Sequence, residues 1–506
     1  MLNQRAKQSQ KQAGQVLAAF ARGLTAKTGR GSVLQWTVVG IVGIILGLFS
    51  TAVPSLPPQW APLFVLAVLC AFLAMIVGNV QKLLLAIIIL DIPFQLDIHL
   101  GYRPEVGALG ALGGLSISAT TLCLAALYIP WLAKLVARRE SSPRRLLRTS
   151  LPLASYFALA ALSVLVARDV TLSMFEIFVL LQTFLLYVYI AATVRTRQDV
   201  LFVVTMLLIG LVLQSLVMIG LGSVGQNFSI AGISSRIDAT TSTAGQFYRV
   251  AGTIGSPNTA ASYLSLLLVP AISLLLTRLG QGYKWLAALA FGLGGAALLL
   301  TFSRGGWVAF ALSITILCLL AWHRGWLPPM VPVVVPLVVV LVSLRFQDAI
   351  LTRLSDVGRA QSRLPLMALS FRVIKDNPLL GVGANNYPTT MKQYATPEFG
   401  GAWLYAVHNK YLLVWAETGI GGLLAFIWFL LATIRRGWQC WKLNDRFLSP
   451  LALGFTAAIV GQMAHMTVEA FRGRSQLQLL WLVAGLIAAM RNMDGDEGRP
   501  CHGVQR

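Results

Sequence analysis

A strongly basic segment, residues 345–410, carries the residue types best suited to chemistry in this chain. It ends at His408-Asn409-Lys410, directly before an apolar run, and His408 is its one histidine. A long cationic loop that is anchored at both ends in apolar sequence suits an anionic, lipid-linked substrate. Eight basic residues stand against four acidic ones: Arg345, Arg353, Arg359, Arg363, Arg372, Lys375, Lys392 and Lys410 against Asp348, Asp356, Asp376 and Glu398.

His408 fits the role of a general base. It stands in YAVHNKYLLVWAETGIGG, where the loop re-enters the apolar region. Histidine takes up a proton near neutral pH, so a histidine that faces a reactive hydroxyl can deprotonate it. A structural histidine at the membrane interface fits the same spacing.

Two neighbours of His408 are expected to support the site. Asn409 is adjacent, and Glu417 follows nine residues later. A helix places Glu417 about 13 Å deeper at 1.5 Å per residue, too far to orient His408 directly. A carboxylate inside a membrane is still a site candidate, because a charge there is energetically costly and is seldom present without a function.

Arg249 and Arg304 stand at the edges of apolar runs, in YRVAGTIGSPN and TFSRGGW. The planar guanidinium fork suits a diphosphate, and the glycines after Arg304 allow a ligand to approach closely. Asn258 stands where a helix begins, and free N–H groups there favour anions. The alternatives are a snorkelling arginine at the membrane surface and an ordinary helix start.

Residues 350–376 have helical spacing, with an apolar face and a helix stop at Asn377-Pro378. Arg363 and Arg372 then project from a helix that lies over the membrane. A solvated interface helix is the simpler interpretation, but the excess of arginine over acid favours anion binding.

His465 and Glu469 are one helical turn apart near the outer end of an expected span. Arg472 and Arg474 follow them. A proton relay is one interpretation of the pair, but a structural hydrogen bond between helices is favoured.

The composition defines the broad class. Hydrophobic residues make up 57% of 506 residues and charged residues 11%, which indicates a polytopic membrane protein. The net charge of +22 arises from basic residues between apolar runs, as expected for topology signals and lipid head groups rather than nucleic acid. The five cysteines form neither a CxxC motif nor a zinc pattern, and no acidic metal motif occurs outside, so no cofactor is expected.

We predict an all-α fold of about fourteen transmembrane helices, within a range of 12–14, and a partly helical periplasmic loop. The expected spans are 36–54, 61–80, 83–96, 114–133, 150–167, 172–194, 200–222, 259–277, 285–303, 306–322, 329–344, 411–434, 450–470 and 475–490.

The distribution of basic residues orients these spans. With the N-terminus in the cytoplasm, 25 of the 40 Lys and Arg residues lie on the cytoplasmic side, as the positive-inside rule expects. The first apolar run is long enough to span, so no cleavable signal is expected. The resulting organisation is a basic cytoplasmic tail (1–34), N-terminal helices (35–222), a periplasmic loop (223–258), further helices (259–344), the large periplasmic loop (345–410), C-terminal helices (411–490) and a cytoplasmic tail (491–506).

Four motifs in order resemble the O-antigen ligase/polymerase superfamily over about residues 240–435. They are YRVAGTIGSPNTAASYL, LTFSRGGW, SRLPLMALSFRVIKDNPLLGVGANNY and HNKYLLVWAETGIGGLL. The superfamily contains lipopolysaccharide O-antigen ligases, polymerases of surface polysaccharides and some protein O-oligosaccharyltransferases. The resemblance implies a bacterial inner-membrane, metal-independent glycosyltransferase that works at the periplasmic face on polyprenyl-diphosphate-linked glycans.

By motif matching, the resemblance implies that Arg249 and Arg304 bind the donor diphosphate, with Arg363 and Arg372 as loop partners. It also implies that His408 activates the acceptor hydroxyl of a glycan, lipid or protein. The chain departs from the family pattern at Leu366-Met367, where many relatives have tryptophan, and in its span count. These departures favour a polymerase or a less specialised ligase.

A transporter or flippase for lipid-linked glycans is the rival from another class, since it too needs many spans and cationic cavities. Few ionisable residues stand in the middle of the expected spans, which disfavours a path across the membrane.

Overall fold

The computed structural model describes residues 79–136, 143–230, 233–242, 245–331, 363–396 and 404–497. The chain divides into two compact units, Met1–Leu83 and Leu84–Arg506. The second unit holds nearly all the described residues and every feature of the site.

Long helices dominate the described residues. They are α4 (Val80–Phe94), α6 (Ala119–Val136), α7 (Pro143–Leu162), α8 (Val170–Thr193), α9 (Arg197–Val224), α10 (Pro257–Leu275), α11 (Gln281–Leu300), α12 (Arg304–His323), α18 (Lys410–Trp441), α19 (Leu448–His465) and α20 (Arg474–Glu497). Shorter helices are α5 (Pro104–Gly107), η3 (Ser163–Val166), α16 (Arg363–Asp376), α17 (Tyr387–Thr390) and η4 (Met391–Tyr394).

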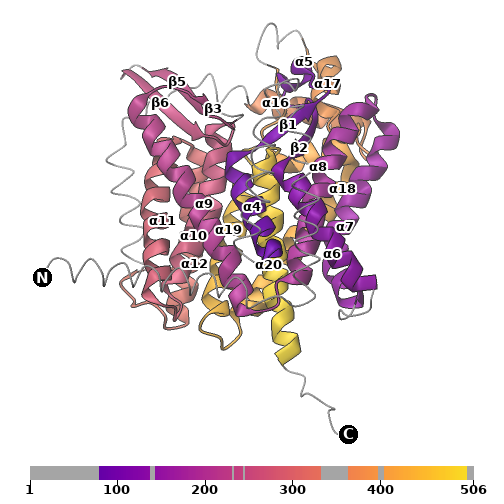
Figure 1. Ribbon diagram of the computed structural model, residues 1–506. Coiled ribbons are helices and arrows are strands. Elements are labelled where there is room, and N and C mark those ends of the chain that lie inside the picture. Colours follow the sequence, from indigo (N-terminus) through magenta and orange to yellow (C-terminus); the bar gives the residue numbers. More distant parts are fainter. Residues whose placement is uncertain are drawn as a thin grey trace, which may run out of the picture. The chain divides into compact units, whose positions relative to one another are not determined.

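The strands form three small antiparallel sheets. β1 (Asp97–Leu100) pairs with β2 (Leu115–Ser118), β3 (Ser229–Ile230) with β4 (Ile233–Ser234), and β5 (Arg236–Ser242) with β6 (Gly245–Gly252). In Figure 1 the labelled strands lie at one end of the helices, at the top of the view, together with α5, α16 and α17. This end holds the site.

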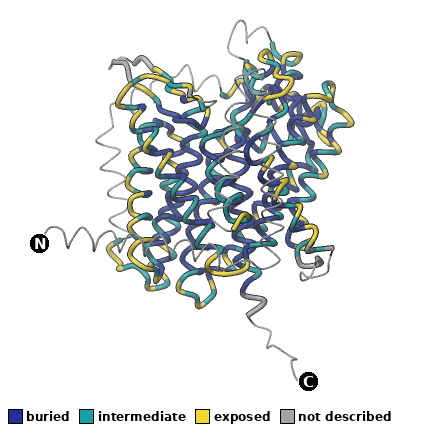
Figure 2. The backbone as a smooth tube through the Cα atoms, viewed as in Figure 1, coloured by how far each residue is buried: buried dark blue, intermediate teal, exposed yellow. Residues whose placement is uncertain are grey.

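The helices pack around a central set that includes α10, α19 and α20. Figure 2 shows most buried residues along the middle of the bundle and many exposed ones at its ends. In the 18-residue apolar stretch of α10, 78% of the residues are buried, whereas 28% of the residues are buried in the corresponding stretch of α11. α10 is therefore an interior helix, whereas α11 is a peripheral one.

Seven helices among the described residues are long and apolar enough to cross a membrane, which supports a multi-pass membrane protein. They are Leu146–Val166, Val170–Thr193, Arg197–Val224, Pro257–Leu275, Gln281–Leu300, Arg304–His323 and Lys410–Trp441. The count of fourteen is not established. The expected spans at 36–54, most of 61–80 and most of 329–344 lie outside the described residues.

The described residues are mostly helical with three small sheets, and residues 223–258, expected as a loop, contain the β5–β6 hairpin. Two of the expected spans have different bounds in the structure. The expected span 114–133 begins with a strand, and helix α6 starts at Ala119. The expected span 450–470 ends at His465, where Met466 O accepts a hydrogen bond from Lys410 N (2.8 Å) and the chain turns.

A kink in α18 explains part of the ETGIGG motif. Gly419 has φ +72°, a left-handed conformation that favours glycine. The break frees the carbonyls of Ala416 and Glu417, which accept from Val382 N (2.9 Å) and Gly383 N (3.0 Å). The loop after α16 is thereby fixed to the transmembrane helix.

Candidate active site

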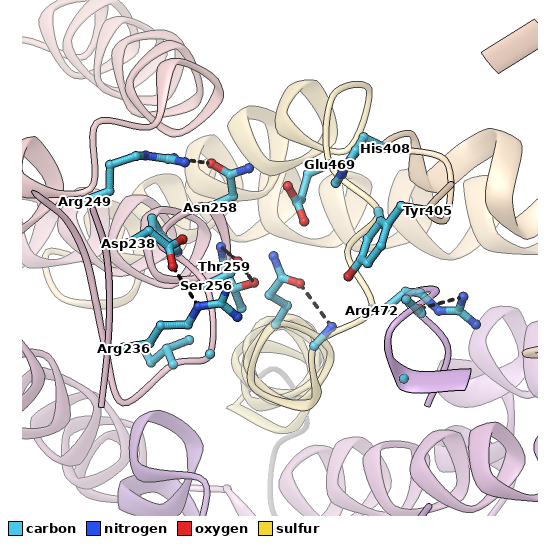
Figure 3. Close-up of a pocket in the computed structure, with 18 of the residues that line it drawn as sticks. Arg236, Asp238, Arg249, Ser256, Asn258, Thr259, Tyr405, His408, Glu469 and Arg472 are labelled. Carbon is cyan, nitrogen blue, oxygen red and sulfur yellow. Dashed lines mark hydrogen bonds and ion pairs between the residues drawn. The ribbon is translucent and has the colours of Figure 1, made fainter. Parts of the chain in front are cut away.

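A polar cavity of about 1130 Å³ lies at the strand-bearing end of the second unit. Its walls include the β5–β6 hairpin, the start of α10, the residues before α18 and the turn between α19 and α20, together with residues after α4, around α5 and at the start of α16. Its lining residues are Gln95, Gly107, Ala108, Gly110, Arg236, Asp238, Arg249, Ile254, Gly255, Ser256, Pro257, Asn258, Thr259, Arg363, Tyr405, His408, Glu469, Ala470, Arg472, Gly473 and Gln476. Figure 3 labels ten of them.

The β5–β6 hairpin places three charged side chains on one face. Arg236 and Asp238 are two residues apart in β5, so they share a face, and Asp238 is directly opposite Arg249 of β6. Arg236 Nε and Asp238 Oδ1 form an ion pair of 2.9 Å.

Arg249 joins two of the sequence motifs. Its Nη2 donates to Asn258 Oδ1 (2.9 Å), and its Nε donates to the backbone oxygen of Thr301 (3.1 Å). Asn258 lies in the first turn of α10, and Thr301 immediately follows α11. Figure 3 shows the guanidinium directed at Asn258. Arg249 is thus held at the mouth of a buried helix.

The start of α10 faces the cavity. Pro257 occupies the first turn, where its missing N–H costs nothing, and Ser256 caps the helix by accepting from Thr259 N (3.2 Å). Helix N-termini carry partial positive charge and favour anions. This end of α10 therefore adds to the positive potential of Arg249.

His408 approaches the cavity from the segment before α18. Asn409 caps that helix by accepting from Leu412 N (3.0 Å), so His408 lies just outside its first turn. Ala406 N donates to Leu109 O (3.0 Å), and the Tyr405 ring stacks on the His408 ring with centroids 5.5 Å apart. The histidine is therefore positioned by backbone pairing and by an aromatic neighbour.

Burial lowers the pKa of His408 to about 4, and the positive charge of Arg363 contributes to this lowering. The imidazole is consequently neutral at neutral pH and able to accept a proton.

Arg363 and Arg304 are close enough for their charges to repel. Burial lowers the pKa of Arg363; the Glu469 carboxyl opposes this and the Arg304 charge reinforces it. Among the described residues, none forms a hydrogen bond or ion pair with the Arg363 guanidinium. Arg304, at the start of α12, is exposed. An anion bound beside these two cations would relieve their repulsion.

The α19–α20 turn, residues 466–473, contributes Glu469 and Arg472. Burial raises the pKa of Glu469 to about 7, while the charge of Arg363 and a hydrogen bond from Asn258 act in the opposite direction. Figure 3 shows Glu469 between Asn258 and His408. This carboxyl and the histidine thus belong to one site.

Arg472 is fixed by a buried network. Its Nη2 contacts Glu417 Oε1 (2.9 Å), Asn385 Oδ1 (2.8 Å) and, at 3.7 Å, Glu176 Oε2. Its Nη1 donates to Gly110 O (3.2 Å). Two carboxylates therefore compensate its charge.

Four residues predicted from separate motifs line the same cavity: Arg249, Asn258, Arg363 and His408. The others lie elsewhere. Asn409 caps α18, and Glu417 is buried in α18 against Arg472. Arg372 is exposed on α16 and donates to Tyr394 O (3.4 Å).

Two sequence interpretations change with the structure. A Cβ at Gly305 would lie 2.8 Å from His465 Cδ2, and one at Gly306 would lie 2.5 Å from Ala261 Cβ. The glycines of TFSRGGW therefore allow close helix packing, rather than the approach of a ligand. His465 and Glu469 do not share a helix turn, because α19 ends at His465.

Sequence reasoning missed several lining residues. Arg236 and Asp238 stand in an alternating stretch, RIDA, which is a strand signal next to Arg249. Glu469 and Arg472 stand out in the sequence as charged residues after an apolar run. The sequence does not show that they line the cavity. Tyr405 and Gln476 carried no signal.

No group of three or more His, Cys, Asp or Glu side chains within the described ranges is arranged to hold a metal ion. The positive charges at the cavity come from arginine side chains and from the end of α10.

A family model matches part of the chain. Residues 287–427 match the family model described as O-Antigen ligase. This range includes Arg363 and His408, whereas Arg249 and the α19–α20 turn lie outside it. None of the curated proteins compared with the chain matches it.

Proposed function

We propose that this chain, which matches the O-antigen ligase family model over residues 287–427, belongs to the O-antigen ligase/polymerase superfamily and is a membrane glycosyltransferase of surface polysaccharide biosynthesis. It transfers a glycan from a polyprenyl-diphosphate donor to an acceptor hydroxyl. The observation that carries the proposal is the convergence of Arg249, Arg363 and His408 on one cavity.

The donor diphosphate binds on the cationic side of the cavity. Arg249 and Arg363 line it, Arg304 adds its charge from the start of α12, and the N-terminus of α10 faces the same space. Positive groups that are already in place stabilise the charge developing on a departing diphosphate, and they do so without reorganisation. In this scheme the arginines supply the charge that a metal ion supplies in other transferases.

His408 accepts the proton of the acceptor hydroxyl. The hydroxyl oxygen attacks the anomeric carbon of the donor while the bond from that carbon to the diphosphate oxygen breaks. The proton passes to His408, and the diphosphate leaves as an anion held by the arginines. A single displacement of this kind inverts the configuration at the anomeric carbon.

Donor binding prepares the base. The charge of Arg363 is one cause of the lowered pKa of His408. A bound diphosphate compensates that charge, so it raises the pKa of His408 and strengthens the base when substrate is present.

The proposed location is the inner membrane with the cavity facing the periplasm. The seven apolar helices support a membrane location, and the distribution of Lys and Arg along the sequence supports this orientation. The donor's polyprenyl tail lies among the helices, and the acceptor is a glycan, a lipid or a protein hydroxyl.

The test uses purified protein in lipid nanodiscs with a polyprenyl-diphosphate-linked oligosaccharide, with and without an added acceptor. A ladder of lengthening glycans identifies a polymerase, and a single transfer identifies a ligase or a protein O-oligosaccharyltransferase. His408→Ala is expected to abolish transfer. Movement of the substrate across a vesicle membrane without transfer would overturn the proposal in favour of a flippase.

A further inference from the structure

Three buried polar atoms in the segment 469–476 lack a hydrogen-bond partner among the residues that the structure describes. They are Glu469 Oε2, Arg472 Nε and Gln476 Nε2. The parent side chains are 7%, 8% and 2% exposed, and all three residues line the cavity. Buried polar groups in native proteins nearly always have partners, so this group needs an occupant.

The three atoms define the chemistry of that occupant. Glu469 Oε2 accepts a hydrogen bond, whereas Arg472 Nε and Gln476 Nε2 donate. A ligand that contacts these atoms must both donate and accept hydrogen bonds. A hydroxyl group does both, and a sugar ring carries several of them.

The local charge disfavours a phosphate here. Arg472 is compensated by Glu417 at 2.9 Å and Glu176 at 3.7 Å, so it adds little net positive charge to the cavity. The Glu469 carboxyl would repel an anion whenever it is ionised. Glu469 thus lowers the net positive charge beside Arg363, and the segment 469–476 offers hydrogen bonds rather than a cationic site.

The donor atoms are held by contacts of their own side chains. Gln476 Oε1 accepts from Gly473 N (3.2 Å), which fixes its amide at the start of α20. Arg472 uses both terminal nitrogens on Asn385, Glu417 and Gly110, which fixes its guanidinium plane. Both donor side chains are therefore already ordered, so a ligand binds to them without further loss of side-chain entropy.

A flat aromatic face lies beside these atoms. Tyr405 also lines the cavity, and a Cβ at Gly110 would lie 2.7 Å from its Cζ. The ring is thus confined between Gly110 and His408, on which it stacks. A confined aromatic side chain gives apolar contact area with a polar tip, which suits the mixed surface of a sugar.

We propose that Glu469, Arg472 and Gln476 form a glycan-binding subsite that reads the hydroxyl groups of the sugar next to the transferred bond. This subsite is distinct from the arginines that hold the diphosphate, and it sets sugar specificity. The inference rests on the proposed function, because it places the glycan of that reaction.

Gln476→Glu changes one atom of the subsite. It keeps the oxygen that accepts from Gly473 N, and glutamate at this position favours the start of a helix. It replaces the donor Nε2 with an acceptor. Gln476→Met is the uncharged companion variant, and unfolding temperatures of both report whether the fold is intact.

The readout is the ratio of two dissociation constants, measured in nanodiscs. The probes are undecaprenyl diphosphate and undecaprenyl diphosphate carrying one N-acetylhexosamine. Both probes share the diphosphate, so the ratio cancels any effect of a new charge on it. We expect both variants to reduce the preference for the sugar-bearing probe about tenfold, as one lost hydrogen bond does.

The outcomes separate the two proposals. Equal weakening of both probes, or no change in either, overturns the glycan subsite and means that water satisfies the amide. Failure of the unaltered protein to bind either probe overturns the proposed function itself. Binding of the sugar-free probe that falls in Arg363→Ala but not in the Gln476 variants supports both proposals.

Discussion

Arg472 and Arg474 differ from Arg363 in what surrounds their charge. Arg472 pairs with Glu417 at 2.9 Å, and Arg474 pairs with Asp91 at 2.7 Å. Among the described residues, none forms a hydrogen bond or ion pair with Arg363, which lines the cavity. The difference between these arginines is therefore one of chemistry.

The comparison separates structural arginines from ligand-binding ones. A buried cation with its own carboxylates holds chain segments together, and its loss leaves those carboxylates uncompensated. A cation beside a cavity without such partners retains positive potential for an anionic ligand. The first kind stabilises the fold, and the second is available for substrate.

The largest effect is expected from removing a structural arginine. Arg474→Met leaves Asp91 and Asp97 without the cation that lies 2.7 Å and 3.3 Å away. We expect the free energy of unfolding to fall by about 3–5 kcal/mol. Thermal unfolding in detergent measures this loss.

The matched control is Arg197→Met, which removes an ion pair with Asp445 whose arginine is 57% exposed. It should cost about 0–1 kcal/mol. If both variants unfold alike, Arg474 does not hold the fold and the distinction between the two kinds of arginine is lost.

The next effect concerns Arg363, and it should be on catalysis rather than stability. Arg363→Ala removes a cation that lines the cavity without a described partner. We expect kcat/KM for transfer to fall by about 10²–10³, as for other groups that stabilise a developing anion. The unfolding temperature should change little, because the loss of the attraction to Glu469 and the relief of the repulsion from Arg304 act in opposite directions.

Arg363→Lys serves as the control, because it keeps the charge but not the planar fork. An intermediate rate is expected. A large drop in unfolding temperature for Arg363→Ala would instead assign Arg363 to the structural group.

The pH dependence of transfer tests the effect of Arg363 on the base. The pKa of His408 is lowered to about 4, so its neutral form persists below pH 6.5 and the acidic limb of kcat/KM should lie there. Removing Arg363 takes away one lowering cause, so the limb should move toward neutral pH. The profile is measured in a Glu469→Gln background, because the pKa of Glu469 is raised to about 7 and would obscure it.

An acidic limb that stays in place when Arg363 is replaced would contradict this coupling. A limb that disappears entirely in Glu469→Gln would identify the carboxyl, rather than His408, as the titrating group.

The sequence allowed part of this comparison to be predicted. Arg249, Arg363 and His408 were found because ionised or titratable residues beside apolar runs are costly and therefore informative. Whether an arginine is structural or ligand-binding could not be predicted in this way. Arg472 is compensated by Glu176 and Glu417, which are far from it in the sequence, so only the folded chain shows that its charge is already matched.

The helix bounds were likewise predicted only where the signal lies in the local sequence. Long apolar helices such as α8, α9 and α10 were predicted to within a few residues, because hydrophobic length is a strong signal. The end of α19 at His465 was missed, since no glycine or proline follows until Gly473. Its position depends on the hydrogen bond from Lys410 N to Met466 O, which is a tertiary contact.

The smallest effect is expected at Arg372. It is exposed on α16, it is not among the cavity-lining residues, and within the described part of the chain its hydrogen bond is a 3.4 Å contact with Tyr394 O. Exposed charges are screened over about 8 Å at physiological ionic strength, so Arg372→Ala should change kcat/KM by no more than about twofold. Assays at low and physiological salt measure the residual long-range attraction. A fall comparable to that of Arg363→Ala would show that the donor extends over the exposed face of α16, and that an arginine outside the cavity also binds substrate.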